Sequence, residues 1–540
     1  MAVSLPRTIR RRGLAAIGIV AAGALLMTGC SLQQNDSDQS QVAADLDFVY
    51  AVPGVPEHLD QTPWGGQPSK ILYSVYDSTL VRYQGTCDVL GESDDLVPHL
   101  AESWELADDG KSVVFRLGDA VSSFGNEITS EDVKWSVERE VALEAFIPSA
   151  LGFIGRYNVA DLVKIIDEKT IQMNVNESTS SDVMQFASIL LTIHDSTEAK
   201  KHITDADPWA TEFLRTNSAN FGPWQIDRFE PSTEVVFSQN PNYKGERGNF
   251  ETVTLRAVAD SATRMQLVRS GDADWADALT FAEYDQLRGT DGVTVEDCVA
   301  ADRDEIFLQQ DGDIFDDVRV RQAISMAIDR DQIVETIYRG FGESAKHGVP
   351  QYYDFPAPDA SYEYDPEGAQ ELLAEAGYPD GLTFTALFSA SRPGPWVESL
   401  AIQIQADLKK IGVTMELNRV AGAAEFFQLV REGRYDATFY SDSTFVGDAT
   451  YGAAAFTLST SNINSFGYNS SEYDALVGNA QEASAEERGE LISQIAELGV
   501  TDMPIVYLVD SANAQAYRDN ISGFHNTPLR TINPALLSVK

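Results

Sequence analysis

Apolar and polar segments alternate most regularly in the second half of the chain. Short runs rich in β-branched and aromatic residues occupy 383–388, 413–417 and 435–440, and between them lie two longer stretches in which apolar residues recur every three or four positions. The short runs are typical of buried strands, and the recurrence of apolar residues predicts helices. Strands that alternate with helices of about a dozen residues predict βαβ units on a mostly parallel sheet, and hence an α/β fold.

Local signals mark several helix ends. Asp365 stands at the N-cap position of one predicted helix, Pro366 follows in its first turn, and Gly377 comes just past its end. Thr129 and Asp132 have the spacing of a capping box, and valines recur at every fourth position after them. The same patterns predict further helices at 261–270, 318–338, 395–411 and 423–432, and strands at 47–52, 113–117, 170–175, two within 221–243, and 253–260, 304–311 and 503–510.

The first 45 residues have a different pattern from the rest. Four arginines within positions 7 to 12 precede 16 uncharged residues, from Gly13 to Thr28, and a transmembrane helix needs about 20. A basic start, a short apolar middle and small residues at the end are typical of a secretory signal peptide. The segment from Met27 to Cys30 resembles a bacterial lipobox, which implies cleavage before Cys30 and attachment of lipid to its thiol.

Residues 1–29 are therefore predicted as a lipoprotein signal peptide, and residues 30–45 as the lipidated Cys30 with a polar, flexible spacer. An ordinary cleaved leader with an incidental cysteine is the alternative, and the arginines leave Sec or twin-arginine export open. No later apolar run approaches transmembrane length. We therefore expect the protein to be anchored to the outer face of the membrane by lipid and not to span the bilayer.

Charge and cysteine content narrow the range of partners. The chain has 39 basic and 83 acidic residues and a net charge of −44, which repels nucleic acid and anionic lipid, so neither is expected as a partner. Its 540 residues, 43% of them hydrophobic, suggest about three domain-sized units with ample core.

Beyond Cys30 only Cys87 and Cys298 remain. In an exported protein these two can form a disulfide, and the sequence leaves open whether they do.

Motifs for catalysis and metal binding are missing from the sequence. It contains no G-x-S-x-G, H-E-x-x-H, Walker A or EF-hand pattern, and its six histidines include no pair three or four positions apart. Adjacent carboxylates are expected by chance among 83 acidic residues, so an enzyme that uses two carboxylates stays an unsupported alternative. No catalytic residue, metal site or cofactor is predicted.

Several sequence blocks between residue 46 and the end resemble one protein family, in the same order. They include ILYSVYDSTLVRY, ITSEDVKWSVER, DDVRVRQAISMAIDRDQIVETIYRGFGESA and YDPEGAQELLAEAGYPDG. The family is that of the extracytoplasmic solute-binding proteins of peptide-, nickel- and opine-type ABC importers. The resemblance implies a two-lobed fold of the large, three-part, type II periplasmic-binding-protein class, with mixed sheets and a hinge between the lobes. It places lobe I at 46–75, 216–303 and 508–540, an inserted subdomain at 76–215, lobe II at 304–507, and hinge crossings near 305–310 and 505–510.

The resemblance also implies where a ligand binds. Peptide-binding members use an aspartate for the ammonium group of the peptide, and dipeptide binders use an arginine for its carboxylate, since charge-assisted bonds fix both ends. Arg392 resembles this arginine and stands just before the helix that carries Trp396. The aspartate is expected after the strand at 435–440. An ungapped comparison puts Phe445 in its place, Asp442 and Asp448 flank that position, and a small gap selects Asp448.

We expect the protein to capture a short peptide and to deliver it to permease subunits that are driven by cytoplasmic ATPases, without chemical change to the peptide. A monomer is expected. The aromatic residue at position 445 leaves a non-peptide solute open, such as an opine, an oligosaccharide or a chelated metal. A receptor-type lipoprotein is a further alternative.

Overall fold

The computed structural model describes residues 46–60, 67–87, 96–107, 112–143, 162–174, 191–350, 352–353, 355–390, 392–443, 449–461, 463–483, 485–527, 530 and 532–540. The predicted signal peptide, Cys30 and the spacer lie outside these residues, as do Phe445 and Asp448.

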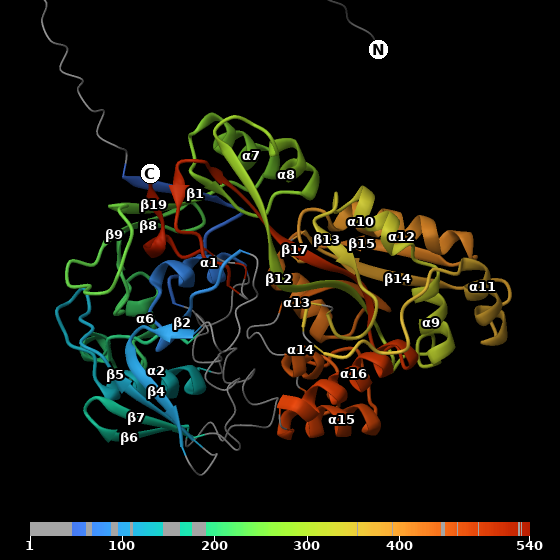
Figure 1. Cartoon of the computed structure of the whole chain (residues 1–540), viewed down its shortest axis with the longest axis horizontal. Coiled ribbons are helices and arrows are strands. Elements are labelled where there is room, and N and C mark those ends of the chain that lie inside the picture. The colour runs from blue at the N-terminus through green and yellow to red at the C-terminus, as the bar shows by residue number, and fades with distance from the viewer. Residues whose placement is uncertain are drawn as a thin grey trace, which may run out of the picture. The chain divides into compact units, whose positions relative to one another are not determined.

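An 11-stranded sheet is the largest element of the structure (Figure 1), with the strand order β15-β14-β16-β12-β17-β11-β1-β10-β9-β8 and with β13 paired to β17. On one side of the sheet lie β1 (Asp47–Val52), β8 (Trp224–Glu230), β9 (Glu234–Gln239), β10 (Thr252–Ala257) and β11 (Trp275–Ala276). On the other side lie β13 (Gly342–Ser344), β14 (Thr383–Phe388), β15 (Thr414–Arg419) and β16 (Ala437–Ser443).

Two long strands join the two sides. β12 (Val293–Leu308) and β17 (Val506–Arg518) run antiparallel from one side to the other, as Figure 1 shows, and β12 also pairs with β16 and β17 with β11. Their register shifts between Cys298 and Asp302 and again between Asp304 and Glu305. Such irregularities bend a strand locally, and they lie in the part of β12 that joins the two sides of the sheet.

The prediction of a mostly parallel sheet is wrong for the sheet as a whole. β14 pairs in parallel with β15 and β16, as the alternation of strands and helices predicted. β12, however, is antiparallel to both β16 and β17, and β9 is antiparallel to β8 and β10. Strand β1 is also parallel to its two neighbours, β10 and β11. The sheet is therefore mixed, since its other pairings are antiparallel.

Helices cover the β14–β15 end of the sheet (Figure 1). They are α9 (Val318–Met326), α10 (Arg330–Thr336), α11 (Pro366–Glu375), α12 (Val397–Lys410), α13 (Ala423–Arg431), α14 (Ala449–Ala455), α15 (Ser471–Glu482) and α16 (Ala485–Thr501). The predicted signals of α11 are confirmed: the Asp365 side chain accepts a hydrogen bond from the Gly368 N–H at 2.9 Å, and Gly377 has a φ of 101°.

The single helix predicted at 318–338 is two helices, α9 and α10. Asp329 starts the second one, since its side chain accepts a hydrogen bond from the Gln332 N–H at 2.9 Å. Asp329 interrupts a continuous repeat of apolar residues. Its side chain caps the N-terminus of α10 by accepting a hydrogen bond from a backbone N–H, so a new helix begins there. The predicted apolar stripe is real, since Val320, Ile324 and Ile328 are fully buried.

A separate four-stranded antiparallel sheet lies within the predicted inserted subdomain. Its order is β4-β5-β7-β6, with β4 at Ala101–Leu106, β5 at Ser112–Leu117, β6 at Val163–Asp167 and β7 at Thr170–Asn174. Helix α2 (Ser130–Ala142) packs on this sheet, and the predicted capping box of Thr129 and Asp132 is present at its start.

The remaining elements are short. They are α1 (Gln67–Tyr76), β2 (Val81–Tyr83), β3 (Leu96–Pro98), α5 (Ser196–Ala199), η3 (Lys200–His202), α6 (Thr211–Leu214), α7 (Ser261–Ser270), α8 (Phe281–Leu287), β18 (Ile521–Ser522), η4 (Pro534–Leu536) and β19 (Ser538–Val539). Among the described helices, none has the length and apolar character that crossing a membrane requires.

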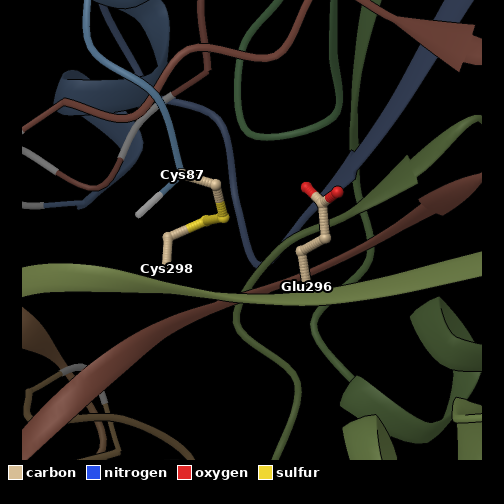
Figure 2. Close-up of side chains that lie close together, drawn as sticks. All are labelled: Cys87, Glu296 and Cys298. Carbon is tan, nitrogen blue, oxygen red and sulfur yellow. A yellow bond between two sulfur atoms is a disulfide. The ribbon is translucent and has the colours of Figure 1, made fainter. Parts of the chain in front are cut away.

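Cys87 and Cys298 form a disulfide, which answers the question that the sequence left open. Figure 2 shows the bond between the loop that follows β2 and strand β12, with Glu296 two positions earlier on that strand. These three side chains are also the one group of potential metal ligands found among the described residues. Since both sulfurs are bonded to each other, neither is a thiolate, and the oxidised group does not fit a metal ion.

Candidate functional site

A cavity of about 330 Å³ opens between the two sides of the main sheet. One wall comes from α1, from the segment that contains α7 and α8, and from Arg530, and the opposite wall comes from the loop between β14 and α12 and from α13. β12 and β17 contribute Asp302 and Asn513 between these walls. The lining residues belong to both predicted lobes, with 304–507 supplying the second wall.

Aromatic rings form part of the lining, from Phe281, Tyr284, Trp396 and Phe427. The rings of Phe281 and Trp396 lie 4.6 Å apart between centroids. The indole Nε1 of Trp396 donates a hydrogen bond to Asp304 at 2.8 Å, and Tyr338 donates to the same carboxylate oxygen. Burial raises the pKa of Asp304 to about 6, against the effect of these two donors. The hydrogen bond to Asp304 and the contact with Phe281 hold the Trp396 ring in place, so that it presents a rigid apolar surface to the cavity.

Arg392 lies in the loop between β14 and α12 and lines the cavity. Its Nε donates to the Ser441 carbonyl at 2.6 Å, and its guanidinium carbon lies 4.6 Å from the ring centroid of Tyr440. Among the described residues, no carboxylate lies within ion-pair distance of this guanidinium. A guanidinium has five N–H donors, so Arg392 retains donors with which to bind a carboxylate through two parallel bonds.

Other charged side chains line the same cavity. The cations are Lys70, Arg264, Arg392 and Arg530, and the carboxylates are Asp277 and Asp302. Burial lowers the pKa of Lys70 to about 8, with Asp302 opposing this effect and Arg392 adding to it. In a buried position of this kind, a nearby anion stabilises the charged form of a lysine.

Two further acidic side chains lie next to these cations. Burial raises the pKa of Asp442 to about 7, although Arg392, Lys70 and Arg303 favour its charged form. Burial, and next the charge of Asp442, also raises the pKa of Glu305 well above its usual range. Arg303 is engaged by Asp510, with N–O distances of 2.5 and 2.9 Å. Next to the cavity there is therefore one buried ion pair, Arg303–Asp510, and two acids whose pKa values burial raises.

The structure brings some of the predicted residues together. Arg392 and Trp396 both line the cavity, and Asp442 follows directly after the lining residue Ser441. Phe445 and Asp448 lie outside the described residues, so their predicted roles stay predictions.

Several cavity residues were missed by the sequence analysis. These residues are Lys70, Arg264, Asp277, Phe281, Tyr284, Asp302 and Arg530. They come from segments far apart in the chain and stand in no recognisable motif. Only contacts between distant segments bring them to one place, and a single sequence does not reveal such contacts.

A two-lobed α/β fold with a mixed sheet and a cavity between its lobes is that of a type II periplasmic binding protein. The chain belongs to a family of this class: residues 95–464 match the model of the bacterial extracellular solute-binding proteins, family 5 Middle.

Known proteins of the same kind are similar over nearly the whole chain. The chain is 26% identical to heme-binding protein A of Haemophilus influenzae, over 94% of this chain and 96% of that protein. It is 27% identical to the probable D,D-dipeptide-binding periplasmic protein DdpA of Escherichia coli, over 87% and 88%. The structure of the periplasmic binding protein DppA from Helicobacter pylori in complex with the peptide STSA superposes with a TM-score of 0.79 at 20% identity, and covers 91% of this chain and 98% of that one.

The protein is thus an extracytoplasmic solute-binding protein of the type that serves ABC importers. This family is one of binding proteins, which agrees with the lack of catalytic motifs in the sequence.

Proposed function

We propose that this protein binds a short peptide in the cavity between its lobes and delivers it to an ABC permease in the cytoplasmic membrane. The observation that carries this proposal is the Arg392 guanidinium, which is oriented by Ser441 and Tyr440 and has no acidic partner among the described residues. A cavity of about 330 Å³ lies near the lower end of the roughly 300–1,000 Å³ range of small-molecule sites. This volume favours a small ligand of dipeptide size.

Each end of the peptide has a proposed partner. Arg392 binds the terminal carboxylate through parallel charge-assisted bonds. Asp448, which follows strand β16 in the sequence, binds the terminal ammonium group, with Asp442 and Phe445 as the alternatives at that end. Trp396 packs against the side chains of the peptide. Binding brings the lobes together around the hinge crossings near 305–310 and 505–510, and the permease recognises the closed form.

The chain is organised accordingly. Residues 1–29 are a signal peptide, and Cys30 carries the lipid that holds the protein beside its permease, followed by a spacer to residue 45. Lobe I consists of 46–75, 216–303 and 508–540, carries the inserted subdomain 76–215, and is followed by lobe II at 304–507. The protein acts as a monomer. A Cys30→Ser variant tests the anchor: it should appear in the culture medium, while the wild-type protein stays with the membrane fraction.

The ligand is tested with protein that starts at Ser31. Native mass spectrometry identifies any solute that is purified with the protein, and isothermal titration calorimetry measures the affinity of dipeptides after the protein has been unfolded and refolded to remove it. We expect a bound mass that fragments as a peptide. Asp448→Asn should weaken dipeptide binding by about tenfold or more, because a charge-assisted bond contributes about 1.5–3 kcal/mol.

Asp380→Asn, at an exposed turn, is the control and should bind as the wild-type protein does. A bound opine, oligosaccharide or metal chelate would keep the importer function and replace the peptide as its substrate. Wild-type affinity in Asp448→Asn would remove Asp448 from the site.

A further inference from the structure

One end of the cavity is closed by aromatic rings from opposite walls. Phe281 comes from α8 on one wall, and Trp396 stands directly before α12 on the other. Their ring centroids lie 4.6 Å apart, and the two residues are only 1% and 7% exposed. Rings at this separation are in contact, so no further side chain fits between them. The two walls therefore meet here, and the rings set how far the cavity extends.

Both rings are held in place by their neighbours. Phe281 also contacts the rings of Tyr338 and Phe341, with centroid distances of 4.8 and 5.8 Å, and both of these residues are fully buried. Trp396 is held by the hydrogen bond from its Nε1 to Asp304. In a close-packed interior, a ring moves only if its neighbours move with it, which costs free energy. This end of the cavity is therefore a wall of fixed position.

Gly394 allows the Trp396 ring to lie against the loop that carries it. Both residues line the cavity, and a Cβ atom at position 394 would overlap the six-membered ring of Trp396. Glycine has no Cβ, so it permits this close approach. With a larger residue the ring would have to shift. Because the ring is bonded to Asp304 and contacts Phe281, we expect this shift to come at the expense of the cavity.

The side chains at this end of the cavity present carbon atoms. Phe281 has no polar side-chain atom, and the one polar atom of the Trp396 side chain is already hydrogen-bonded within the protein. Leu279 and Pro395, which also line the cavity, are apolar as well. Such a surface gains free energy from contact with an apolar group and leaves a buried polar group without a partner. This end therefore suits an apolar part of a solute, whereas Arg392 is suited to a carboxylate.

We propose that Phe281 and Gly394 are specificity-determining residues, which together with Trp396 form an apolar subsite that limits the size of one side chain of the solute. A compact aliphatic side chain fits this subsite, and one as large as that of tryptophan does not. The assignment of this side chain to a peptide rests on the proposed function, whereas the size limit rests on the packing of the two rings.

Two substitutions should change the subsite in opposite directions. Calorimetry measures the affinities of the dipeptides Ala-X and X-Ala, with X as alanine, leucine or tryptophan. In the wild-type protein, leucine should bind tenfold or more tightly than tryptophan in one of the two series. Phe281→Ala should abolish or reverse this preference, because the space left by a deleted aromatic side chain accepts an apolar group. Gly394→Ala should bind leucine no more tightly than alanine, since the displaced ring fills the subsite.

Two control variants separate specificity from stability. Phe315→Ala removes another buried phenylalanine, which contacts Phe384 and is not among the described residues that line the cavity. Gly478→Ala adds a Cβ in α15, which meets none of the described atoms outside its own helix within 4 Å. Both should keep the wild-type ratio of the leucine and tryptophan affinities. If thermal unfolding shows that Phe281→Ala is not folded, Phe281→Leu replaces it and should change the ratio in the same direction.

The wild-type ratio in the Phe281 variant would overturn the role of Phe281, and wild-type affinity for leucine in Gly394→Ala would overturn that of Gly394. Equal wild-type affinities for leucine and tryptophan in both series would overturn the size limit. Each of these results leaves the peptide function intact.

Native mass spectrometry compares the solutes that are purified with the wild-type protein and with the Phe281 variant. Non-peptide solutes that are larger in the variant would support the size limit and overturn the peptide. If no dipeptide binds, and the variant carries the same solutes as the wild type or none, both proposals are wrong.

Discussion

Two buried arginines show how differently this protein uses the same side chain. Arg139, on α2, is fully buried, and its guanidinium is satisfied by Asp60, with one N–O distance of 3.0 Å, and by the Trp209 carbonyl at 3.0 Å. Arg392, beside the cavity, makes one hydrogen bond to a carbonyl and stacks on a ring, with no acidic partner among the described residues. A guanidinium that is paired with a buried carboxylate stabilises the fold, whereas one without an acidic partner among the described residues is suited to binding an anionic group.

The largest expected difference between the two arginines is in stability. Arg139→Met removes the arginine that pairs with the buried Asp60 carboxylate, so the free energy of unfolding should fall by about 3–5 kcal/mol. Arg392→Met should change it by less than about 1 kcal/mol, because Arg392 forms no ion pair with a described carboxylate. Chemical denaturation followed by circular dichroism measures both.

The double variant Arg139→Met/Asp60→Leu is the control for the charge. It removes both partners and should recover most of the lost stability, since an apolar pair of similar volume can replace a buried ion pair. A double variant as unstable as Arg139→Met would mean that packing, and not the unpaired charge, explains the loss.

The second difference is in ligand affinity. Arg392→Met should weaken the binding of the solute found in the wild-type protein by about tenfold to a hundredfold, the effect of losing a charge-assisted contact of about 1.5–3 kcal/mol. Arg228→Met, which removes an exposed arginine on β8, should bind as the wild type does. Calorimetry on the refolded, ligand-depleted proteins gives both values, and full affinity in Arg392→Met would contradict the comparison.

The smallest effect is a pH dependence that comes from the acid next to Arg392. Burial raises the pKa of Asp442 to about 7, so between about pH 4 and pH 7 the folded protein holds a proton that the unfolded chain has lost. Stability therefore falls as the pH rises through this window. Asp442→Asn removes this titrating group, so its stability should fall less than that of the wild type across the same window.

Thermal unfolding at pH 4.5, 6 and 7.5 measures this slope. Glu140→Gln, which removes the acid next to Arg139, provides the matched comparison, since burial raises the pKa of Glu140 to about 8. Its effect should extend to a higher pH than that of Asp442→Asn. An identical slope in the wild type and in Asp442→Asn would show that Asp442 is ionised in the folded protein across the window.

The sequence predicted local structure well where a few adjacent residues decide it. The cap at Asp365 and the capping box at Thr129 are present, and the strand at 47–52 has the predicted bounds. The prediction was wrong where the length of a helix or strand depends on contacts with distant parts of the fold. Asp329 splits one predicted helix, and β12 extends over 16 residues although only 304–311 was predicted as strand. The extension pairs with β17 and β16, and such pairing leaves no periodic signal in a single strand.

The candidate site was predictable only in the part that the family resemblance covers. Arg392 and Trp396, which the resemblance assigned to ligand binding, both line the cavity, and their role in binding stays a prediction. Lys70 and Arg530 are separated by 460 positions and became visible only through the fold. Nothing in their immediate neighbours distinguishes them from the other lysines and arginines of the chain.

The bond between Cys87 and Cys298 joins positions that are 211 residues apart. The chain between them is a covalently closed ring, which contains the complete four-stranded sheet and strands β8 to β11 of the main sheet. A protease that cuts once inside this ring leaves a single molecule, which migrates as one band on a non-reducing gel and separates into two fragments only when a thiol is added. Outside the cell, where proteases are common and thiols scarce, a nicked molecule therefore stays in one piece.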